Sequence, residues 1–199
     1  HQGKLIPPVP PVPALFDDQA YPDGIYAGTM SGDIRDGHGQ MKYNNGDYYN
    51  GEWQNDRKHG NGKMIHNNGD TYIGGWVENY KNGKGKMTYT NGDEYTGQWE
   101  NDEPIGQGKL RDKYNNIYTG NLDAVLQKTG QGYMMYINGD TYDGQWEKNK
   151  KQGQGVMKYK NGDEYTGQWI NDVREGQGTL QYLVGGIYKG SWSLDRKQG

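Results

Sequence analysis

Cysteine is absent from this chain of 199 residues, and aliphatic side chains are scarce. Without cysteine there is no disulfide and no thiolate metal site, which fits a reducing compartment. Leu, Ile, Val and Phe together number only 26, and Phe occurs once. Because so few aliphatic groups cannot fill a conventional core, the fold must take its apolar area from other residues.

The chain also lacks a large excess of charge of either sign and any long apolar run. Its 22 basic and 25 acidic residues leave a formal net charge of −3, which provides no basic face for bulk nucleic-acid binding. No apolar run approaches the roughly 18 residues of a membrane helix, and the N-terminus has no signal-peptide pattern. We therefore expect a cytoplasmic protein without nucleic acid among its partners.

Glycine and aromatic residues are abundant, with 34 Gly, 18 Tyr and 6 Trp, and they recur at a fixed period. A Tyr heads each unit at intervals of 23 residues, with one interval of 24, and a Gly-x-Gly pair follows each of the first seven. This periodicity predicts a repeat array over residues 24–199, with seven repeats and a truncated eighth, after a proline-rich extension over residues 1–23. The leading tyrosines are Tyr26, Tyr49, Tyr72, Tyr95, Tyr118, Tyr142, Tyr165 and Tyr188.

Each unit has the pattern of two β-strands. In Tyr49-x-Gly51-x-Trp53 alternation places both rings and the glycine on one face, and after a polar loop a second strand begins at Gly60. An Asn-Gly pair then follows, which is a strong hairpin signal. We predict an all-β fold, a single-layer antiparallel β-hairpin solenoid of fifteen strands that forms a curved, elongated ribbon.

The register of the Asn-Gly hairpin depends on the length of its loop. A three-residue loop with a left-handed Gly46 pairs Met41 with Tyr49 and Gly39 with Gly51, so that all apolar side chains share one face. A two-residue turn would put Met41 on the opposite face. We therefore predict the three-residue loop, with the rings lying over paired glycines.

The repeat resembles a known family. The segments Tyr95-Thr96-Gly97-Gln98-Trp99 and Tyr165-Thr166-Gly167-Gln168-Trp169, each followed by a Gly-x-Gly pair, resemble the MORN repeat (membrane occupation and recognition nexus). Such arrays occur in junctophilins, plant phosphoinositide kinases, a histone methyltransferase, ciliary radial-spoke proteins and protist cytoskeletal proteins. The resemblance implies a β-hairpin solenoid with a scaffold or targeting role, and our first hypothesis is a non-catalytic scaffold of a cytoskeletal or ciliary assembly. The alternatives are a membrane-targeting module and the regulatory region of a longer enzyme.

No catalytic, cofactor-binding or metal-binding residues stand out. The Gly-x-Gly pairs lack the third glycine of a dinucleotide-binding loop and do not open a helix. The histidines lack the spacing of metal ligands, and aspartates such as Asp47 and Asp70, which follow Asn-Gly, have the pattern of turn residues. We predict a protein that is not an enzyme and binds no cofactor.

The ring-bearing face is the predicted binding surface for an extended or helical segment of a partner protein. One possibility is that the rings are consumed by packing on the glycines and on each other. Any ring area left over would form an exposed stripe, because a single layer has nothing to cover it, and such patches mark interaction sites. The candidate residues are Tyr49, Trp53, Tyr72, Trp76, Tyr95, Trp99, Tyr142, Trp146, Tyr165 and Trp169.

Basic residues in the polar loops are the candidates for binding acidic phospholipids. At about 1 kcal/mol per basic residue near an anionic surface, and with acidic neighbours, they would give only marginal binding. A solvated edge is the simpler interpretation. These residues are Arg57, Lys58, Lys148, Lys150 and Lys151.

The two ends of the chain have features of their own. The segment LIPPVPPVPALF favours a polyproline II conformation. It fits a disordered leader, a ligand of SH3 or WW domains, or a strip that packs on the curved ribbon through Leu15 and Phe16. The strand around Tyr188–Trp192 would present an open edge, which predicts end-to-end self-association.

Overall fold

The computed structural model describes residues 19–198, which form seventeen β-strands and no helix. Within this range nothing meets the length and hydropathy of a membrane-spanning helix. The chain divides between Glu103 and Pro104 into two compact units, unit 1 (residues 1–103) and unit 2 (residues 104–199). Each unit is described by itself.

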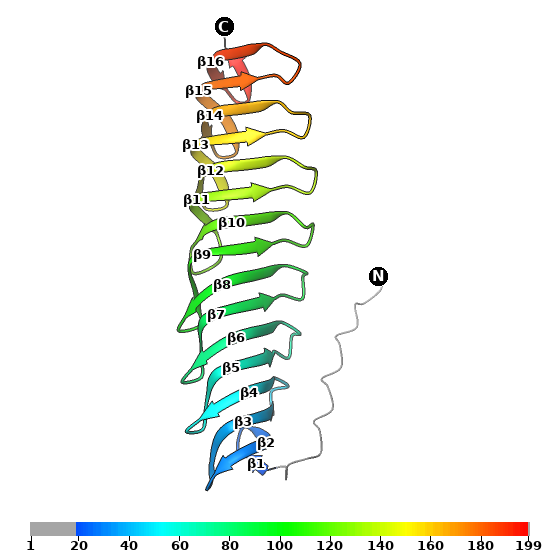
Figure 1. The fold of residues 1–199 in the computed structure, drawn as a ribbon, viewed down its shortest axis with the longest axis vertical. Helices are drawn as coiled ribbons and strands as arrows, with labels where there is room; N and C mark the ends of the chain where they lie inside the picture. Colours follow the sequence, from blue (N-terminus) through cyan, green and yellow to red (C-terminus); the bar gives the residue numbers. More distant parts are fainter. Residues whose placement is uncertain (1–18, 199) are drawn as a thin grey trace. The chain divides into compact units, whose positions relative to one another are not determined.

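Unit 1 is a single-layer sheet in which each strand pairs antiparallel with the next strand of the chain (Figure 1). Short turns join the strands, so each strand finds its partner in its chain neighbour. The strands are β1 (Gln19–Tyr21), β2 (Gly24–Ser31), β3 (Ile34–Tyr43), β4 (Tyr48–Gln54), β5 (Arg57–Ile65), β6 (Thr71–Val77), β7 (Tyr80–Thr88) and β8 (Glu94–Glu100).

Unit 2 has the same construction, with antiparallel pairing from each strand to the next. Its first strand begins one residue before the division. The all-β, single-layer hairpin array is thus confirmed in both units. The strands are β9 (Glu103–Arg111), β10 (Ile117–Leu122), β11 (Lys128–Met135), β12 (Thr141–Glu147), β13 (Lys150–Lys158), β14 (Glu164–Ile170), β15 (Val173–Gln181), β16 (Ile187–Ser193) and β17 (Arg196–Gln198).

The Asn-Gly hairpins have the predicted three-residue loop. Tyr43 N donates to Asp47 O at 2.9 Å, and Gly46, at φ +92°, donates its N–H to Tyr43 O at 3.0 Å. Met41 pairs with Tyr49. The apolar side chains therefore share one face, as predicted.

The polar loop at the other end of the hairpin is shorter than expected. Gln54 pairs with Arg57, which leaves Asn55 and Asp56 as a two-residue turn with φ of +48° and +64°. Positive φ at both central residues is the type I′ geometry, which Asn and Asp tolerate. The expected start of the second strand at Gly60 is therefore wrong, because β5 already begins at Arg57.

The two glycines of each Gly-x-Gly pair have different roles. Gly60 is left-handed at φ +57°, next to the point where the register of β4 and β5 shifts between Gly51 and Glu52, so it forms a β-bulge. Gly62 lies under the Tyr49 ring, where an added Cβ would be 2.3 Å from the hydroxyl oxygen. The predicted placement of rings over glycines is thus confirmed.

The core of each unit is a row of alternating tyrosine and tryptophan rings. Tyr49 packs edge-on against Trp53, with centroids 5.3 Å apart, and against Trp76 of the next repeat at 5.4 Å. The Tyr49 hydroxyl donates to Glu52 O at 2.9 Å, and Trp76 Nε1 donates to Gly62 O at 3.2 Å. Contacts between the rings and hydrogen bonds from their polar atoms therefore stabilise this face of the sheet, which has no second layer of structure to cover it.

Both ends of the described chain differ from expectation. Trp192 of β16 pairs with Lys197 of β17, so the strand around Tyr188–Trp192 is covered and is not the edge of the described sheet. Whether the array self-associates stays a prediction. At the other end the sheet begins at Gln19, inside the segment assigned to the extension, while the proline-rich residues 1–18 lie outside the described residues.

Candidate protein-interaction surface

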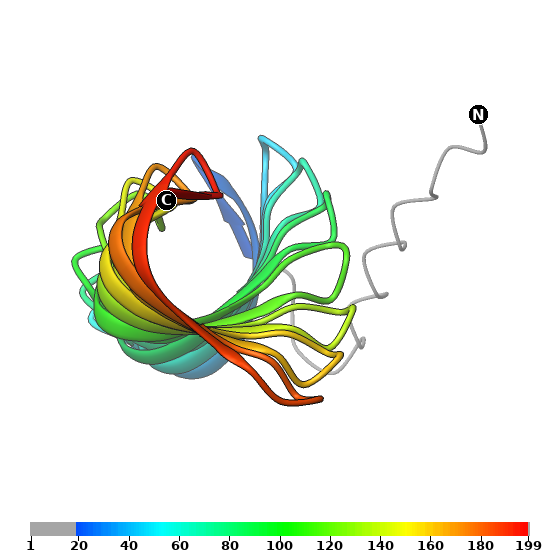
Figure 2. The same ribbon diagram turned by 90° about the horizontal axis from the view of Figure 1, so that it is seen from above.

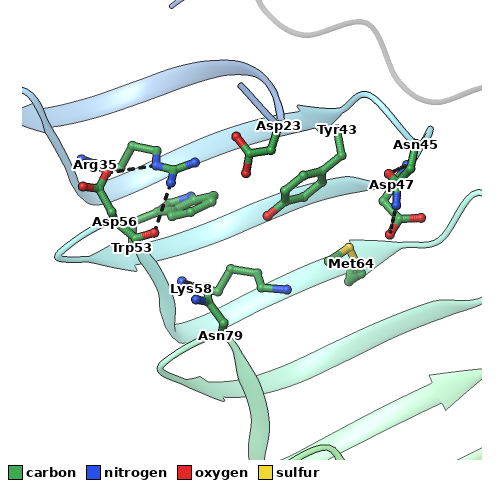
Figure 3. A pocket seen from close by; sticks show the side chains of 10 residues that line it. All are labelled: Asp23, Arg35, Tyr43, Asn45, Asp47, Trp53, Asp56, Lys58, Met64 and Asn79. Carbon is green, nitrogen blue, oxygen red and sulfur yellow. Dashed lines mark hydrogen bonds and ion pairs between the residues drawn. The ribbon is translucent and has the colours of Figure 1, made fainter. Parts of the chain in front are cut away.

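One face of the sheet in unit 1 is concave. Arg35 and Tyr43 are eight residues apart in β3, a separation of about 26 Å on a straight strand, but both line one hollow (Figure 3). Gly37, left-handed at φ +98°, bends the strand between them. Figure 2 shows this curvature in the strands of each unit. The bend brings the two ends of a hairpin toward each other.

Cations line one side of this face, one from each repeat except the fourth, which has Pro104 at that position. Lys58 Nζ lies 4.3 Å from the centroid of the Trp76 ring and 5.8 Å from that of Tyr49, both within the range of cation–π attraction. The indole is thus covered by the cation of the preceding repeat. This cation row comprises Arg35, Lys58 and Lys81 in unit 1, and Lys128, Lys151, Arg174 and Lys197 in unit 2.

The turn of the next hairpin holds the backbone of a cation-row residue. Arg35 N donates to Asp56 Oδ1 at 2.9 Å, and Asp56 N donates to Arg35 O at 3.0 Å. Arg35 Nε also contacts the carboxylate, at 3.1 Å, and the Arg35 side chain is only 11 % exposed. Hydrogen bonding from Arg35 lowers the pKa of the Asp56 carboxyl below its usual value. This two-way contact fixes the spacing of neighbouring repeats.

In unit 1, Lys58 is the member of the cation row whose neighbouring turn offers an amide in place of a carboxylate, as Asn149 does for Lys128 in unit 2. Asn79 Oδ1 accepts a hydrogen bond from Lys58 N at 2.8 Å, and among the described residues the ammonium has no ion pair. Burial lowers the pKa of Lys58 to about 8, against the opposing attraction of Asp102. Lys58 also borders the hollow (Figure 3), so its charge is placed to receive a carboxylate from a ligand.

Tyrosines line the opposite side of the concave face. Burial raises the pKa of Tyr43 to about 12, although the charge of Arg35 lowers it in part. In unit 2, Lys151 Nζ lies 5.9 Å from the Tyr136 ring and 4.5 Å from Trp169, so the two sides approach each other. His66 and Asp112 interrupt the series. This tyrosine row comprises Tyr43 and Tyr89 in unit 1, and Tyr136, Tyr159 and Tyr182 in unit 2.

We call the surface between the cation row and the tyrosine row of a unit its trough. In unit 1 it contains a hollow of about 310 Å³, which reaches Trp53 and Met64 at its floor. Asp23, Asn45 and Asp47 stand at its rim. The residues of both rows are half-buried in unit 1, whereas the rings beneath them are buried.

The ten aromatic residues predicted to bind a partner lie in the core rather than on the surface. Their exposed fractions lie between 0 and 4 %, because each ring packs against its neighbours and most of the rings also lie under a cation of the cation row. The prediction of an exposed stripe of rings is therefore wrong. The alternative holds instead, namely that the rings are buried by packing on the glycines and on each other. Direct partner binding by Tyr49, Trp53, Tyr72, Trp76, Tyr95, Trp99, Tyr142, Trp146, Tyr165 and Trp169 stays an untested prediction.

The five basic residues predicted to bind lipid are divided between different environments. Lys58 and Lys151 belong to the cation row and lie over Trp76 and Trp169, in the strands β5 and β13 rather than in a loop. Arg57 pairs with Glu78 at 3.1 Å. Lys148 and Lys150 are exposed at a turn of unit 2. The predicted placement of Lys58 and Lys151 in polar loops is therefore wrong, because the strands are joined there by two-residue turns. Phospholipid binding stays a prediction.

The aspartates that follow Asn-Gly have a structural role. Asp47 Oδ1 accepts a hydrogen bond from Asn67 N at 2.8 Å, and Asp140 Oδ1 accepts one from Lys160 N at 2.8 Å. They therefore join the turns of successive repeats. Among residues 19–198 no group of three or more His, Cys, Asp or Glu side chains is arranged to hold a metal ion.

Solved structures of other proteins are similar to this chain, and one of them has a TM-score above 0.5. The TCP domain of SAS-4 (dCPAP) from Drosophila melanogaster, solved in complex with a proline-rich motif of Ana2 (dSTIL), is 14 % identical with a TM-score of 0.51. That match covers 78 % of this chain and 84 % of that one. The TCP10 domain of Danio rerio CPAP is 11 % identical with a TM-score of 0.49, over 78 % of this chain and 73 % of that one. At such identities the likeness shows the fold alone. No curated protein matches the chain.

The repeats themselves match a family model, described as the MORN repeat. The match covers more than half of the chain and leaves out the irregular fifth repeat, which contains Leu122 in place of the tryptophan. The matched segments are residues 26–48, 49–71, 72–94, 95–113, 142–164 and 165–186. The chain therefore belongs to the MORN-repeat family.

Proposed function

We propose that the chain is a non-catalytic protein-interaction module that binds an extended segment of a partner protein along the trough. The observation that carries this proposal is the hollow in unit 1, where Arg35, Tyr43 and Lys58 converge above an apolar floor. Half-buried aromatic and cationic side chains of this kind supply large contact area at low cost in side-chain entropy.

The trough combines three kinds of contact that an extended peptide can use. Tyr43 offers a ring and a hydroxyl group, and Lys58 offers an ammonium group without an ion pair among the described residues. Met64 adds an apolar surface at the floor. The SAS-4 domain of similar fold was solved with a proline-rich motif of its partner, which supports a peptide ligand for this chain as well.

The setting we propose is a cytoskeletal or ciliary assembly in the cytoplasm, in which the array acts as a scaffold. This part of the proposal rests on the kinds of protein in which such repeats occur. It is tested by whether a fluorescent fusion of the chain localises to these structures, and a diffuse distribution would count against it.

The binding proposal is tested with short peptides. A library of 12-residue peptides displayed on phage is selected on the full chain, and the best peptide is labelled and titrated by fluorescence anisotropy. We expect Tyr43→Ala combined with Lys58→Gln, or Tyr159→Ala combined with Lys151→Gln, to weaken binding by about tenfold or more. The matched control is Lys63→Gln, an exposed lysine on the opposite face of β5. Equal affinity for the wild type and both trough variants would overturn the proposal.

A further inference from the structure

The trough presents the same contacts at a regular spacing. Equivalent residues of successive repeats are two strands apart, so Arg35, Lys58 and Lys81 follow one another at about 9.6 Å across the sheet. In the tyrosine row of unit 1, Tyr43 and Tyr89 are two repeats apart, and His66 takes the position between them. A ligand that lies along the trough can make the same contact with each repeat only if its own side chains recur at about this distance.

One regular backbone conformation has this period. A polyproline II helix has three residues per turn and rises about 3.1 Å per residue, so every third side chain recurs after about 9.3 Å. An α-helix repeats a face after about 5.4 Å, and an extended strand after about 6.6 Å. Over the three repeats of unit 1 the mismatch for polyproline II accumulates to only about 1 Å. The spacing therefore selects a polyproline II ligand.

The chemistry of the trough fits such a ligand. Proline-rich segments dock in grooves lined by aromatic side chains, and their preformed backbone loses little entropy on binding. Tyr43 and Tyr89 supply rings along one side of the unit 1 trough, and on the other side Lys58 and Lys81 lie against the indoles. Apolar side chains at every third position of the ligand would alternate with these groups along the floor.

The chain carries a segment with this pattern ahead of β1. Residues 5–16 read LIPPVPPVPALF, without a charged residue, and the prolines fall in a three-residue rhythm. Ile6, Val9, Val12 and Leu15 occupy every third position. In a polyproline II helix these four side chains form one stripe, which recurs at the spacing of the repeats.

The length and attachment of the segment also match unit 1. Twelve residues of polyproline II span about 34 Å, and the eight strands of unit 1 span about 34 Å at 4.8 Å each. Only Asp17 and Asp18 separate the segment from β1 (Gln19–Tyr21), the first strand of that unit, so the segment can follow the trough from β1 toward β8.

We propose that residues 5–16 occupy the trough of unit 1 in their own chain as a polyproline II helix, with the stripe from Ile6 to Leu15 facing the floor. The leader is then an internal competitor, and an external partner of unit 1 must carry the same three-residue apolar period to displace it. This inference rests on the proposed function of the trough and specifies the class of ligand.

The test uses the full chain and a labelled synthetic peptide of residues 5–16. The double variant Val9→Asp, Val12→Asp keeps the full chain but places two charges in the apolar stripe of the leader, so that the leader should no longer bind the trough. We expect the peptide to bind this variant about tenfold or more tighter than the wild type, because the wild-type trough is already filled at high effective concentration. A matched peptide with one glycine inserted after Val9 breaks the period and is expected to bind about tenfold weaker, whereas a glycine added at the end is expected to change nothing.

The outcomes separate the inference from the function on which it rests. Equal affinity of the labelled peptide for wild type and variant, or equal affinity of the two glycine peptides, overturns the inference. If the phage-selected peptide binds the trough but the leader peptide binds neither chain, the proposed function stands and the inference falls. If neither peptide binds, both fall. A dimer that dissociates on Val9→Asp, Val12→Asp, detected by light scattering, would overturn occupation within the same chain.

Discussion

The ammonium of Lys58 lies 4.3 Å from the centroid of the Trp76 ring, and the two residues belong to successive repeats. Arg174 stands in the same relation to Trp192, also at 4.3 Å. A cation of one repeat thus covers the indole of the next, so the rings maintain the fold while the cations form the surface. Substitutions of the rings should therefore affect mainly stability, and substitutions of the cations should affect mainly binding.

The pH dependence of stability tests the environment of Lys58. Its pKa is lowered by burial to about 8, whereas an exposed lysine titrates near 10.5. Between these values the unfolded chain binds more protons at this site than the folded chain, so stability rises with pH. We expect the wild type to gain on the order of 2 kcal/mol relative to Lys58→Met between pH 7 and pH 10. Urea unfolding of both proteins measures this, and a difference that does not change with pH would contradict it.

The buried tyrosines predict the opposite trend at higher pH. Burial raises the pKa of Tyr26 and Tyr118 to about 12, above the ordinary value of 10. Above pH 10 the unfolded chain loses these protons and the folded chain keeps them, so stability falls as pH rises. We expect the exposed tyrosines to ionise first and the ionisation of the buried tyrosines, followed by absorbance at 295 nm, to coincide with unfolding. Ionisation of all the tyrosines near pH 10 in a chain whose circular dichroism is unchanged would contradict this.

Two glycines of β7 provide a matched pair for the packing of the rings. An added Cβ at Gly85 would lie 2.3 Å from the Tyr72 hydroxyl oxygen, whereas Gly83, at φ +77°, has nothing within 4 Å of that position. We expect Gly85→Ala to cost about 2–3 kcal/mol and Gly83→Asn less than about 1 kcal/mol, because Asn tolerates the left-handed region. Hydrogen exchange should show lost protection in β6 and β7 but not in β13 to β15. Uniform loss along the chain would refute this local account.

Asp56 tests the link between repeats. Asp56→Asn keeps an oxygen for the Arg35 amide, as Asn79 does for Lys58 at 2.8 Å, and we expect a cost below about 1 kcal/mol. Asp56→Ala removes the acceptor and places alanine at φ +64°, with an expected cost of about 2 kcal/mol. Exchange of the Arg35 amide hydrogen reports both. Equal effects of the two substitutions would show that the hydrogen bond does not matter.

Ring and surface variants should separate stability from binding. Trp76 is 3 % exposed, so Trp76→Ala is expected to destabilise its hairpins by about 3–5 kcal/mol and to weaken peptide binding only as far as it unfolds them. Tyr43→Ala should weaken peptide binding with a smaller loss of stability. Thermal unfolding and peptide titration of the same samples make the comparison. If Trp76→Ala weakened binding without loss of stability while Tyr43→Ala left binding unchanged, the rings would be the residues that bind the partner directly.

The repeat, the strand pairing and the shared face could be predicted from the sequence because each depends on local patterns. The 23-residue period marks the units, and one-sided placement of Met41 and Tyr49 requires the three-residue loop. The position of Lys58 could not be predicted while residues 54–59 were taken for a loop. With Asn55 and Asp56 as a two-residue turn, Lys58 pairs with Trp53 and shares its face.

The burial of the rings could not be predicted from the alternation of residues along the strands alone. A flat sheet would expose Trp53, but the bulge at Gly37 bends the strand and brings Arg35 over the indole, 4.6 Å from its centroid. The signal was present in the sequence, since a cation recurs in every repeat except the fourth at the period of the tyrosines. The meaning of this recurring cation can be recognised only after the turn type is known, because the turn determines on which face of the sheet the cation lies.

The most direct test of the binding surface is photo-crosslinking of the selected peptide. A benzophenone group at the centre of the phage-selected peptide is irradiated in complex with the full chain, and the attachment sites are mapped by mass spectrometry. If the peptide binds along the trough, we expect crosslinks to trough residues, which are Arg35, Tyr43 and Lys58 in unit 1 or Lys151 and Tyr159 in unit 2. Crosslinks concentrated on Lys63, Lys86 or Tyr133, on the opposite face of the sheet, would contradict it.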